Sequence, residues 1–346
     1  MSFAEQSPFS GQQIARAFSP VATGTALQVQ EVLAGNINTI LKVESAGQHY
    51  GLRVRTQESV YRYEPDLVKE VFVLQLLQTA GDGLNDAQVA AAFKQLFAAQ
   101  YGTVTQCVSP APSVHYFDWS RRLLPHPYCI YEWVDGEPLW NLPEPRLYAL
   151  AGVALAKIHQ VQFSAFYADF LSIGVNPVSW NERFRAALSK EIAAARVRLP
   201  GDLAEQLEKL PIPLAADCTP CLVHNDFAPG NILVQQGQIA AVIDWDNAVI
   251  EAPHLDFVKM KYWTAKKVDG ELTHDSALFT AVVDGYGAAG REIVNSPLFA
   301  LYEVLWLLRV FNFEQSKEEQ GLARAPGYPA AEVYMRYLAE VLRRVE

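Results

Sequence analysis

Polar side chains suited to metal binding and proton transfer are concentrated in two short stretches of the chain, CLVHNDFAPGNILV and VIDWD. They are His224, Asp226, Asn231, Asp244 and Asp246. An amide oxygen and a carboxylate, as in Asn231 and Asp244, suit Mg²⁺, which takes one or two protein oxygens and completes its shell with water and phosphate. Asp226 precedes Asn231 in the same loop and could accept a proton from an incoming hydroxyl group.

A β-hairpin is expected to bring the two stretches together. Two apolar runs, 232–235 and 239–243, flank the turn QQGQ and are rich in strand-forming residues. Their pairing would place Asn231 and Asp244 at the same end of the hairpin. A single Asp or Asn in a turn often bonds only its own backbone. Turn chemistry does not require H-x-D-x-x-x-x-N followed by a hairpin and I-D, so the joint pattern favours a functional site.

The surrounding elements form a β-rich first part and a mainly helical second part. Strands are expected at 26–34, 36–45, 47–56 and 128–138, the second and third as a hairpin. Helices are expected at 66–79, 87–100, 145–160, 181–197 and 201–210, and through most of 254–346. This order predicts an α+β fold with two domains, residues 1–130 and 131–346.

Composition limits the possible partners and location. The net charge of −10 argues against nucleic acid or an anionic membrane as partner, and fits either a cationic substrate or solubility alone. No apolar run approaches the ~20 residues of a membrane span. The N-terminus lacks the pattern of a signal peptide, so a cytoplasmic location is expected. Cys218 and Cys221 have redox spacing but lie in a Pro-containing loop, and they are expected to be inert.

The joint pattern closely resembles the catalytic and metal-binding loops of the aminoglycoside phosphotransferase and choline kinase-like family, which shares the protein-kinase fold. Protein kinases use H-R-D-x-x-x-x-N and D-F-G where this chain has HNDFAPGN and IDWD. Asn225 replaces the arginine, and EAPHLDF stands in place of A-P-E, which favours the small-molecule kinases. The resemblance implies a kinase-like two-lobe fold, with residues 1–130 as the nucleotide-binding lobe and 131–346 as the catalytic helical lobe.

The resemblance also implies nucleotide-binding residues in the first part of the chain. Arg53 in YGLRVRT would contact phosphate, which a guanidinium group can bind in bidentate fashion. Glu70 would be its acidic partner on the following helix. The backbone groups of Glu132 and Val134 would bond the adenine edge, and Gly35 is the counterpart of the glycine-rich loop.

The resulting prediction is an enzyme, a kinase that uses ATP, or alternatively GTP, and Mg²⁺ to phosphorylate a hydroxyl group of a small molecule. Asp226 would be the catalytic base, with Asn231 and Asp244 as metal ligands, while His159 and His224 would be structural. Two alternatives stay open. One is a nucleotide-binding module without catalysis. The other is a hydrolase with two metal ions bound by His224, Asp226, Asp244, Asp246, His254 and Asp256.

The acceptor is predicted only by class: an aminoglycoside, an amino alcohol, a sugar or a hydroxy amino acid. An acidic, Trp-containing group of residues in the helical part would suit a cationic acceptor, although the same residues also fit ordinary helix packing. The group comprises Trp180, Asp256, Trp263, Glu303, Trp306 and Glu314.

Overall fold

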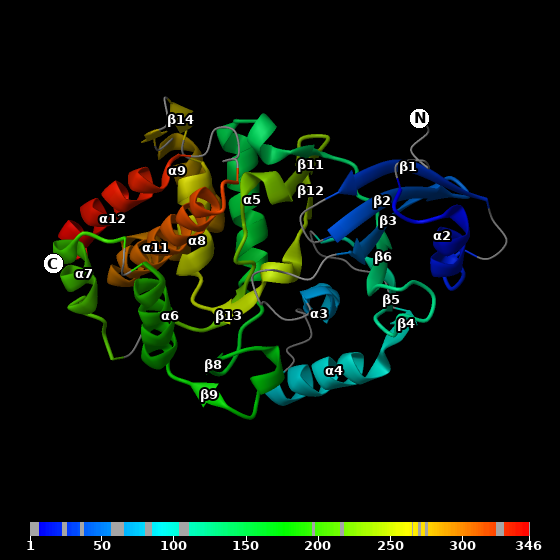
Figure 1. The fold of residues 1–346 in the computed structure, drawn as a ribbon, viewed down its shortest axis with the longest axis horizontal. Coiled ribbons are helices and arrows are strands. Elements are labelled where there is room, and N and C mark those ends of the chain that lie inside the picture. Colours follow the sequence, from blue (N-terminus) through cyan, green and yellow to red (C-terminus); the bar gives the residue numbers. More distant parts are fainter. Residues whose placement is uncertain are drawn as a thin grey trace. The chain divides into compact units, whose positions relative to one another are not determined.

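The computed structural model of the protein divides into two compact units (Figure 1). It describes residues 7–345 except 23–25, 35–37, 57–65, 80–84, 104–110, 196–197, 215–217, 265, 269–270, 274–275 and 323–328. The first unit comprises Met1–Glu137 and Leu233–Ala248, and the second comprises Pro138–Ile232 and Val249–Glu346. The hairpin after Asn231 therefore belongs to the first unit, whereas a single boundary after residue 130 leaves it with the second.

A six-stranded sheet in the order β1-β2-β3-β6-β5-β4 forms the centre of the first unit (Figure 1). Its strands are β1 (Leu27–Ala34), β2 (Asn38–Ser45), β3 (Gln48–Arg55), β4 (Tyr101–Thr103), β5 (Val114–Asp118) and β6 (Tyr128–Glu132). β2 and β3 form the predicted hairpin, and their register runs from Ser45 opposite Gln48 to Asn38 opposite Arg55. Ala46 and Gly47 both have positive φ, as the tightest hairpin turns require.

The two faces of β3 have different neighbours. Helix α2 (Gly11–Phe18) contributes Phe18 to a buried apolar core that also contains Leu52 and Val54 of β3. Because side chains alternate along a strand, Arg53 points to the opposite face. Helix α3 (Asp66–Thr79) contacts β5 and β6, and it has the predicted boundaries. Helix α4 (Asp86–Ala99) follows, with an Asn85 capping box at its start.

A small sheet in the order β12-β11-β7 contains the second predicted hairpin. Its strands are β7 (Glu137–Pro138), β11 (Ile232–Gln235) and β12 (Gln238–Val242). The turn residues Gln236 and Gly237 have positive φ. β12 leads into the 3-10 helix η4 (Trp245–Asn247), which contacts α3. The hairpin thereby brings Asp244 and Asp246 to the helix that carries Glu70.

The second unit is mainly helical, as predicted. Its helices are α5 (Pro145–Ile158), α6 (Trp180–Ala195), α7 (Gly201–Glu208), α8 (His254–Trp263), α9 (Ser276–Tyr286), α10 (Ala288–Asn295), α11 (Pro297–Glu319) and α12 (Ala331–Val345). Its short elements are η1 (Leu139–Asn141), β8 (Phe166–Tyr167), η2 (Phe170–Ser172), β9 (Pro177–Val178), β10 (Cys221–Val223), η3 (Pro229–Asn231), β13 (Val249–Glu251), β14 (Lys266–Val268) and β15 (Glu271–Thr273). The α+β class is confirmed.

Close helix packing and one strand pair organise this second unit. α5 and α9 approach so closely that a Cβ on Gly152 would lie 2.0 Å from the carbonyl oxygen of Val282. The strands β10 and β13 pair antiparallel, with Leu222 opposite Ile250. Among the described helices, no single one is long and apolar enough to cross a membrane, and only the bent pair α10 and α11 meets that length and composition test jointly.

Candidate active site

Arg53 is the centre of an ionic cluster in the first unit. Its Nη1 donates to Glu70 Oε1 at 2.8 Å, and its Nη2 donates to Asp244 Oδ1 at 3.1 Å and to Asp246 Oδ2 at 2.9 Å. The two terminal nitrogens of the guanidinium group can bond α3 and the η4 region at the same time. The structure thus brings together Arg53, Glu70 and Asp244, which the sequence predicted for nucleotide or metal binding, and Asp246, whose polar side chain was noted in the same motif.

Burial and charge act in opposite directions on this cluster. Burial alone would lower the pKa of Arg53, but the surrounding carboxylates outweigh it, and the pKa of the guanidinium group is raised. Burial raises the pKa of Glu70 to about 7, even though Arg53 opposes the shift. One cation faces three carboxylates, so the cluster carries surplus negative charge that a bound cation would neutralise.

Asp244 is the most accessible carboxylate of the cluster. Its side chain is 40% exposed, whereas those of Glu70 and Asp246 are 7% and 15% exposed. Its backbone has φ 68° and ψ 63°, a left-handed conformation that is rare outside glycine and costs of order 1 kcal/mol or more. This conformation turns the chain abruptly from β12 into η4 and directs the Asp244 carboxylate toward Arg53.

The loop that follows β10 in the second unit is held by Asp256 at the start of α8. The Asp256 carboxylate is fully buried and accepts hydrogen bonds from the backbone N–H groups of His224 and Asn225, both at 2.8 Å. Asn225 has a positive φ of 59°, which asparagine tolerates better than most residues. The loop after β10 therefore turns at Asn225 because a buried carboxylate holds both N–H groups there.

The two histidines predicted to be structural are both buried and hydrogen bonded. His224 is completely buried and its Nδ1 accepts the backbone N–H of Asp226 at 3.2 Å. His159 lies 3.2 Å from the Asp256 carboxylate through Nε2 and 3.1 Å from Tyr286 through Nδ1. Both imidazoles therefore maintain the conformation around the loop.

Asp226 and Asn231 contact each other directly across η3. The Asn231 Nδ2 group donates to the backbone oxygen of Asp226 at 3.0 Å and to its Oδ2 atom at 3.1 Å. Because both of these partners are acceptors, the amide nitrogen must face them, and the amide oxygen is directed away. Asn231 can therefore offer Oδ1 to a cation while it orients the Asp226 carboxylate.

A glycine allows an aromatic ring to lie against this loop. A Cβ atom on Gly230 would lie 3.0 Å from the ring of Trp140, which belongs to η1 and is 59% exposed. The ring therefore covers the backbone just before Asn231. Trp140 was not among the sequence-predicted site residues, since nothing in its local sequence connects it to the loop.

Each unit holds one oxygen donor of the kind that Mg²⁺ prefers. In the second unit the Asn231 Nδ2 group faces Asp226, which leaves its amide oxygen on the other side, and in the first unit the Asp244 side chain is 40% exposed. Within the described part of the chain, no group of three or more His, Cys, Asp or Glu side chains forms a metal-binding cluster. Mg²⁺ commonly takes only one or two protein oxygens and completes its shell with phosphate and water, so either donor suits it.

The structure describes the two positions predicted to bind adenine, Glu132 and Val134, but not the predicted glycine-loop position. Glu132 ends β6, and its backbone N–H donates to the Ser113 carbonyl at 2.8 Å, so this N–H group is already bonded inside the protein. Val134 follows in a half-buried loop position. Gly35 lies outside the described residues.

Most residues proposed from the sequence for the acceptor are packed inside the second unit. Exposure is 5% or less for Trp180, Asp256, Glu303, Trp306 and Glu314. Trp180 stacks on Phe184, and Trp306 stacks on Tyr262. Their burial favours the packing interpretation, and Trp263 alone of the set is partly exposed.

Lys259 is a second residue beside this loop that was not predicted from the sequence. Its Nζ lies 3.5 Å from Asp226 Oδ1. It follows Asp256 by three residues in HLDFVKM, so both lie on one face of α8. The spacing becomes informative only together with the contact between Asp256 and the loop, which the structure shows and the sequence does not.

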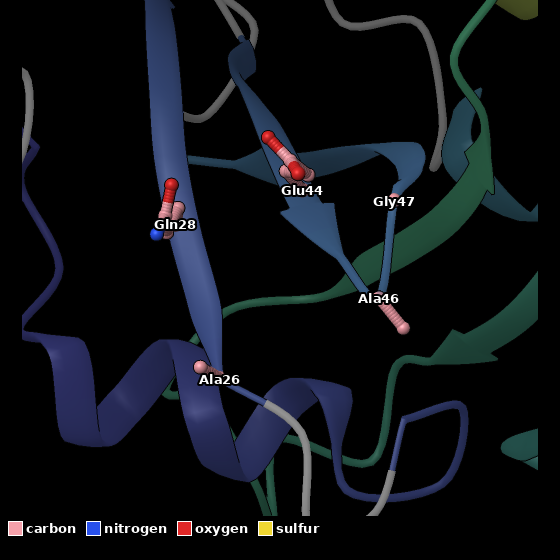
Figure 2. Close-up of a pocket in the computed structure, with 5 residues that line it drawn as sticks. All are labelled: Ala26, Gln28, Glu44, Ala46 and Gly47. Atoms are coloured by element: carbon pink, nitrogen blue, oxygen red, sulfur yellow. The ribbon is translucent and has the colours of Figure 1, made fainter.

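Two hollows in the structure lie apart from these clusters. A shallow pocket of about 300 Å³ at the β1–β2 edge is lined by Ala26, Gln28, Glu44, Ala46 and Gly47 (Figure 2). A cavity of about 430 Å³ in the second unit lies beside Arg183, Glu251 and Tyr302. There Arg183 pairs with Glu251 at 2.7 Å, and Tyr302 donates to the same carboxylate at 2.7 Å. The Glu251 carboxylate of this cavity is therefore bonded on both oxygens by its neighbours.

Protein families and curated sequences similar to this chain are phosphotransferases. The model of the family described as "Phosphotransferase enzyme family" matches residues 28–292. A curated relative, hygromycin-B 4-O-kinase of Escherichia coli, is 26% identical over 157 residues, which are 39% of this chain and 43% of the relative. The chain thus spans less than half the length of that relative in the match.

Solved structures show the same fold over nearly the whole chain. Aminoglycoside phosphotransferase APH(4)-Ia has a TM-score of 0.60 at 17% identity, covering 96% of this chain and 99% of that one. A ternary complex of a thermostable mutant of that enzyme with ADP and hygromycin B has a TM-score of 0.54 at 17% identity, covering 97% and 98%. A gentamicin complex of APH(2'')-IIa has a TM-score of 0.55 at 14% identity, covering 97% of both chains. The predicted kinase-like fold is confirmed.

Proposed function

Because the chain belongs to the phosphotransferase enzyme family, we propose that it transfers the γ-phosphoryl group of ATP to a hydroxyl group of a small molecule. The observation that carries the proposal is the geometry of Asp226. Its carboxylate is partly exposed, Asn231 orients one of its oxygens, and the loop that holds it is fixed by buried Asp256. A positioned, accessible carboxylate is the group that accepts the acceptor's proton in this chemistry.

Each residue then has one task. Asp226 orients the hydroxyl group and accepts its proton as the oxygen attacks phosphorus and the bond to the bridging oxygen of ADP breaks. Asn231 Oδ1 and the Asp244 carboxylate would be the protein groups that hold the Mg²⁺ of the nucleotide. When bound, Mg²⁺ would neutralise phosphate charge. Arg53, held by Glu70, binds phosphate oxygens.

Adenine would contact the backbone carbonyl of Glu132 and a backbone group of Val134. The acceptor class follows from relatives that act on or bind hygromycin B and gentamicin. We therefore place aminoglycosides and other amino alcohols first, ahead of sugars and hydroxy amino acids. The net charge of −10 is compatible with such cationic acceptors.

The test is an ATP-consumption screen with hygromycin B, gentamicin, macrolides, amino alcohols, sugars and hydroxy amino acids, followed by mass spectrometry of the product. We expect one acceptor class to gain a phosphate group. Asp226→Asn should lower turnover by at least about 10³-fold, because the proton acceptor is lost, while Mg²⁺–ATP still binds. Undiminished turnover in this variant would contradict the assignment of Asp226.

The two competing functions predict different results. A nucleotide-binding module without catalysis would bind Mg²⁺–ATP and phosphorylate no acceptor in the screen. A two-metal hydrolase would cleave phosphate esters without nucleotide. The structure disfavours the hydrolase, since Asp256 binds backbone N–H groups and His254 bonds Ser296.

A further inference from the structure

Lys259 places a positive charge beside Asp226 that the catalytic loop does not supply. The four residues between Asp226 and Asn231 are Phe227, Ala228, Pro229 and Gly230, none of which is charged. The Lys259 ammonium group reaches the loop from α8 and lies 3.5 Å from Asp226 Oδ1. Its side chain is 18% exposed and that of Asp226 is 28% exposed, so both groups are partly shielded from solvent.

The position of Lys259 is determined by a rigid anchor. Asp256, one turn earlier on α8, is fully buried and binds two backbone N–H groups of the loop. Residues three apart lie on one helix face, so the same anchor fixes the distance between Lys259 and Asp226. A surface ion pair between two flexible side chains would lack such support.

The neighbouring lysine of α8 shows that this placement is specific. Lys261 pairs with the buried carboxylate of Glu303 and lies over the ring of Phe299. Lys261 therefore belongs to the packing of α8 against α11. Lys259 instead contacts the side chain that we assign as the base.

We propose that Lys259 is a further catalytic residue, whose ammonium group binds the phosphoryl group during its transfer to the acceptor beside Asp226. The inference rests on the proposed function. The acceptor oxygen must lie about 2.6–3.2 Å from Asp226 to pass its proton, and phosphorus must lie about 3–3.5 Å from that oxygen. An ammonium group 3.5 Å from the carboxylate that contacts the acceptor hydroxyl therefore lies close to the place of the equatorial phosphoryl oxygens.

The charge balance explains what Lys259 contributes. As the acceptor oxygen forms its bond to phosphorus, its proton moves to Asp226 and the bond between phosphorus and the leaving oxygen of ADP breaks. The three equatorial phosphoryl oxygens carry negative charge throughout, close to the carboxylate of Asp226. A fixed cation between the two anionic groups offsets their repulsion, which is strongest in the transition state.

The test measures binding of a phosphoryl mimic and needs no acceptor. The affinity of the protein for ADP·Mg²⁺ is measured with and without aluminium fluoride, and the affinity for AMP-PNP·Mg²⁺ is measured separately. Aluminium fluoride should increase the affinity of the wild type for ADP·Mg²⁺, and Lys259→Met should reduce this gain in affinity, called the tightening below, at least tenfold. The same variant should change the affinity for AMP-PNP·Mg²⁺ less than twofold. Lys259→Arg should retain most of the tightening. Lys209→Met, at an exposed lysine on the second unit, is the matched control and should match the wild type.

The possible outcomes separate the inference from the proposed function. If Lys259→Met keeps the full tightening, or loses AMP-PNP and fluoride-complex affinity equally, the inference is overturned. The same holds if the wild type binds ADP·Mg²⁺ without any tightening by aluminium fluoride. If the wild type binds no Mg²⁺–nucleotide at all, the proposed function itself fails. With an acceptor from the screen, Lys259→Met should lower kcat and leave KM for ATP unchanged.

Discussion

The Arg53 cluster and the Asp226 loop hold their carboxylates in opposite ways. In the first unit, one buried cation contacts three carboxylates. In the second unit, the buried Asp256 carboxylate is satisfied mainly by backbone N–H groups, and Asp226 is left partly exposed. The first arrangement stores negative charge around a fixed arginine, whereas the second fixes the backbone and leaves one carboxylate accessible for chemistry.

The two regions should therefore respond differently to mutation. Loss of Arg53 leaves buried charge without compensation, so stability should fall first. Loss of Asp256 removes acceptors from a loop whose turn depends on them, so turnover and stability should fall together.

The largest effect is expected for Asp256→Asn. Both carboxylate oxygens of Asp256 accept backbone N–H groups, whereas an asparagine side chain has only one acceptor oxygen. Its NH₂ group would face a backbone N–H donor, so the turn at Asn225 should open. Turnover should fall at least about 100-fold, and the free energy of unfolding should fall by about 3–5 kcal/mol. Steady-state kinetics and urea unfolding measure the two effects. Asp284→Asn, at an exposed ion pair, is the control and should change neither appreciably.

Arg53→Met should act mainly on stability of the first unit. It leaves Glu70 buried with no cation beside it, which costs about 3–5 kcal/mol when a buried pair is broken on one side. Arg53→Lys should recover only part of the loss, because a lysine cannot reach three carboxylates in the same fork geometry. Urea unfolding checks both variants, and a loss below about 1 kcal/mol in Arg53→Met would contradict the account of the cluster.

A pH dependence of stability should arise in the second unit from His254. Burial lowers the pKa of His254 from 6.5 to about 4, so the folded protein keeps the imidazole neutral where the unfolded chain protonates it. The contribution is complete above pH 6.5 and is lost as pH falls toward 4, by about 3 kcal/mol in total.

The check is the slope of the free energy of unfolding between pH 4 and 6.5. It should flatten in His254→Gln, even though that variant also loses the stacking of His254 on Tyr302. An unchanged slope would show that other groups cause the dependence. Glu70 would tilt stability the other way, because burial raises its pKa and the folded protein then holds a proton that the unfolded chain releases.

The smallest effect is expected for Gly230→Ala. The added Cβ would meet the Trp140 ring at 3.0 Å, but an exposed ring can move, so the cost should stay below about 1 kcal/mol. The tryptophan emission should shift, because Trp140 leaves the loop. Gly285→Ala offers the contrast, since its Cβ would lie 1.9 Å from the rigid backbone oxygen of Ala149 and should destabilise the protein far more.

The local elements could be predicted from the sequence alone, and so could the loop that carries the proposed reactive residues. Alternation in YGLRVRT placed Arg53 opposite Leu52 and Val54, and helical periodicity defined α3 at its observed boundaries. The spacing of Asp226 and Asn231 identified the loop, because one turn of 3-10 helix suffices to bring them into contact. Such features depend on neighbours within about ten residues, which is the range over which backbone geometry acts.

Which distant groups complete each cluster depends on the packing of the folded chain. Nothing in the sequence showed that Asp246 would join Arg53, that Asp256 would hold the turn at Asn225, or that Lys259 would lie beside Asp226. These contacts join residues 31 to 193 positions apart. They depend on how helices pack on the loop and the sheet, and packing selects partners by distance in space, to which sequence separation gives no guide.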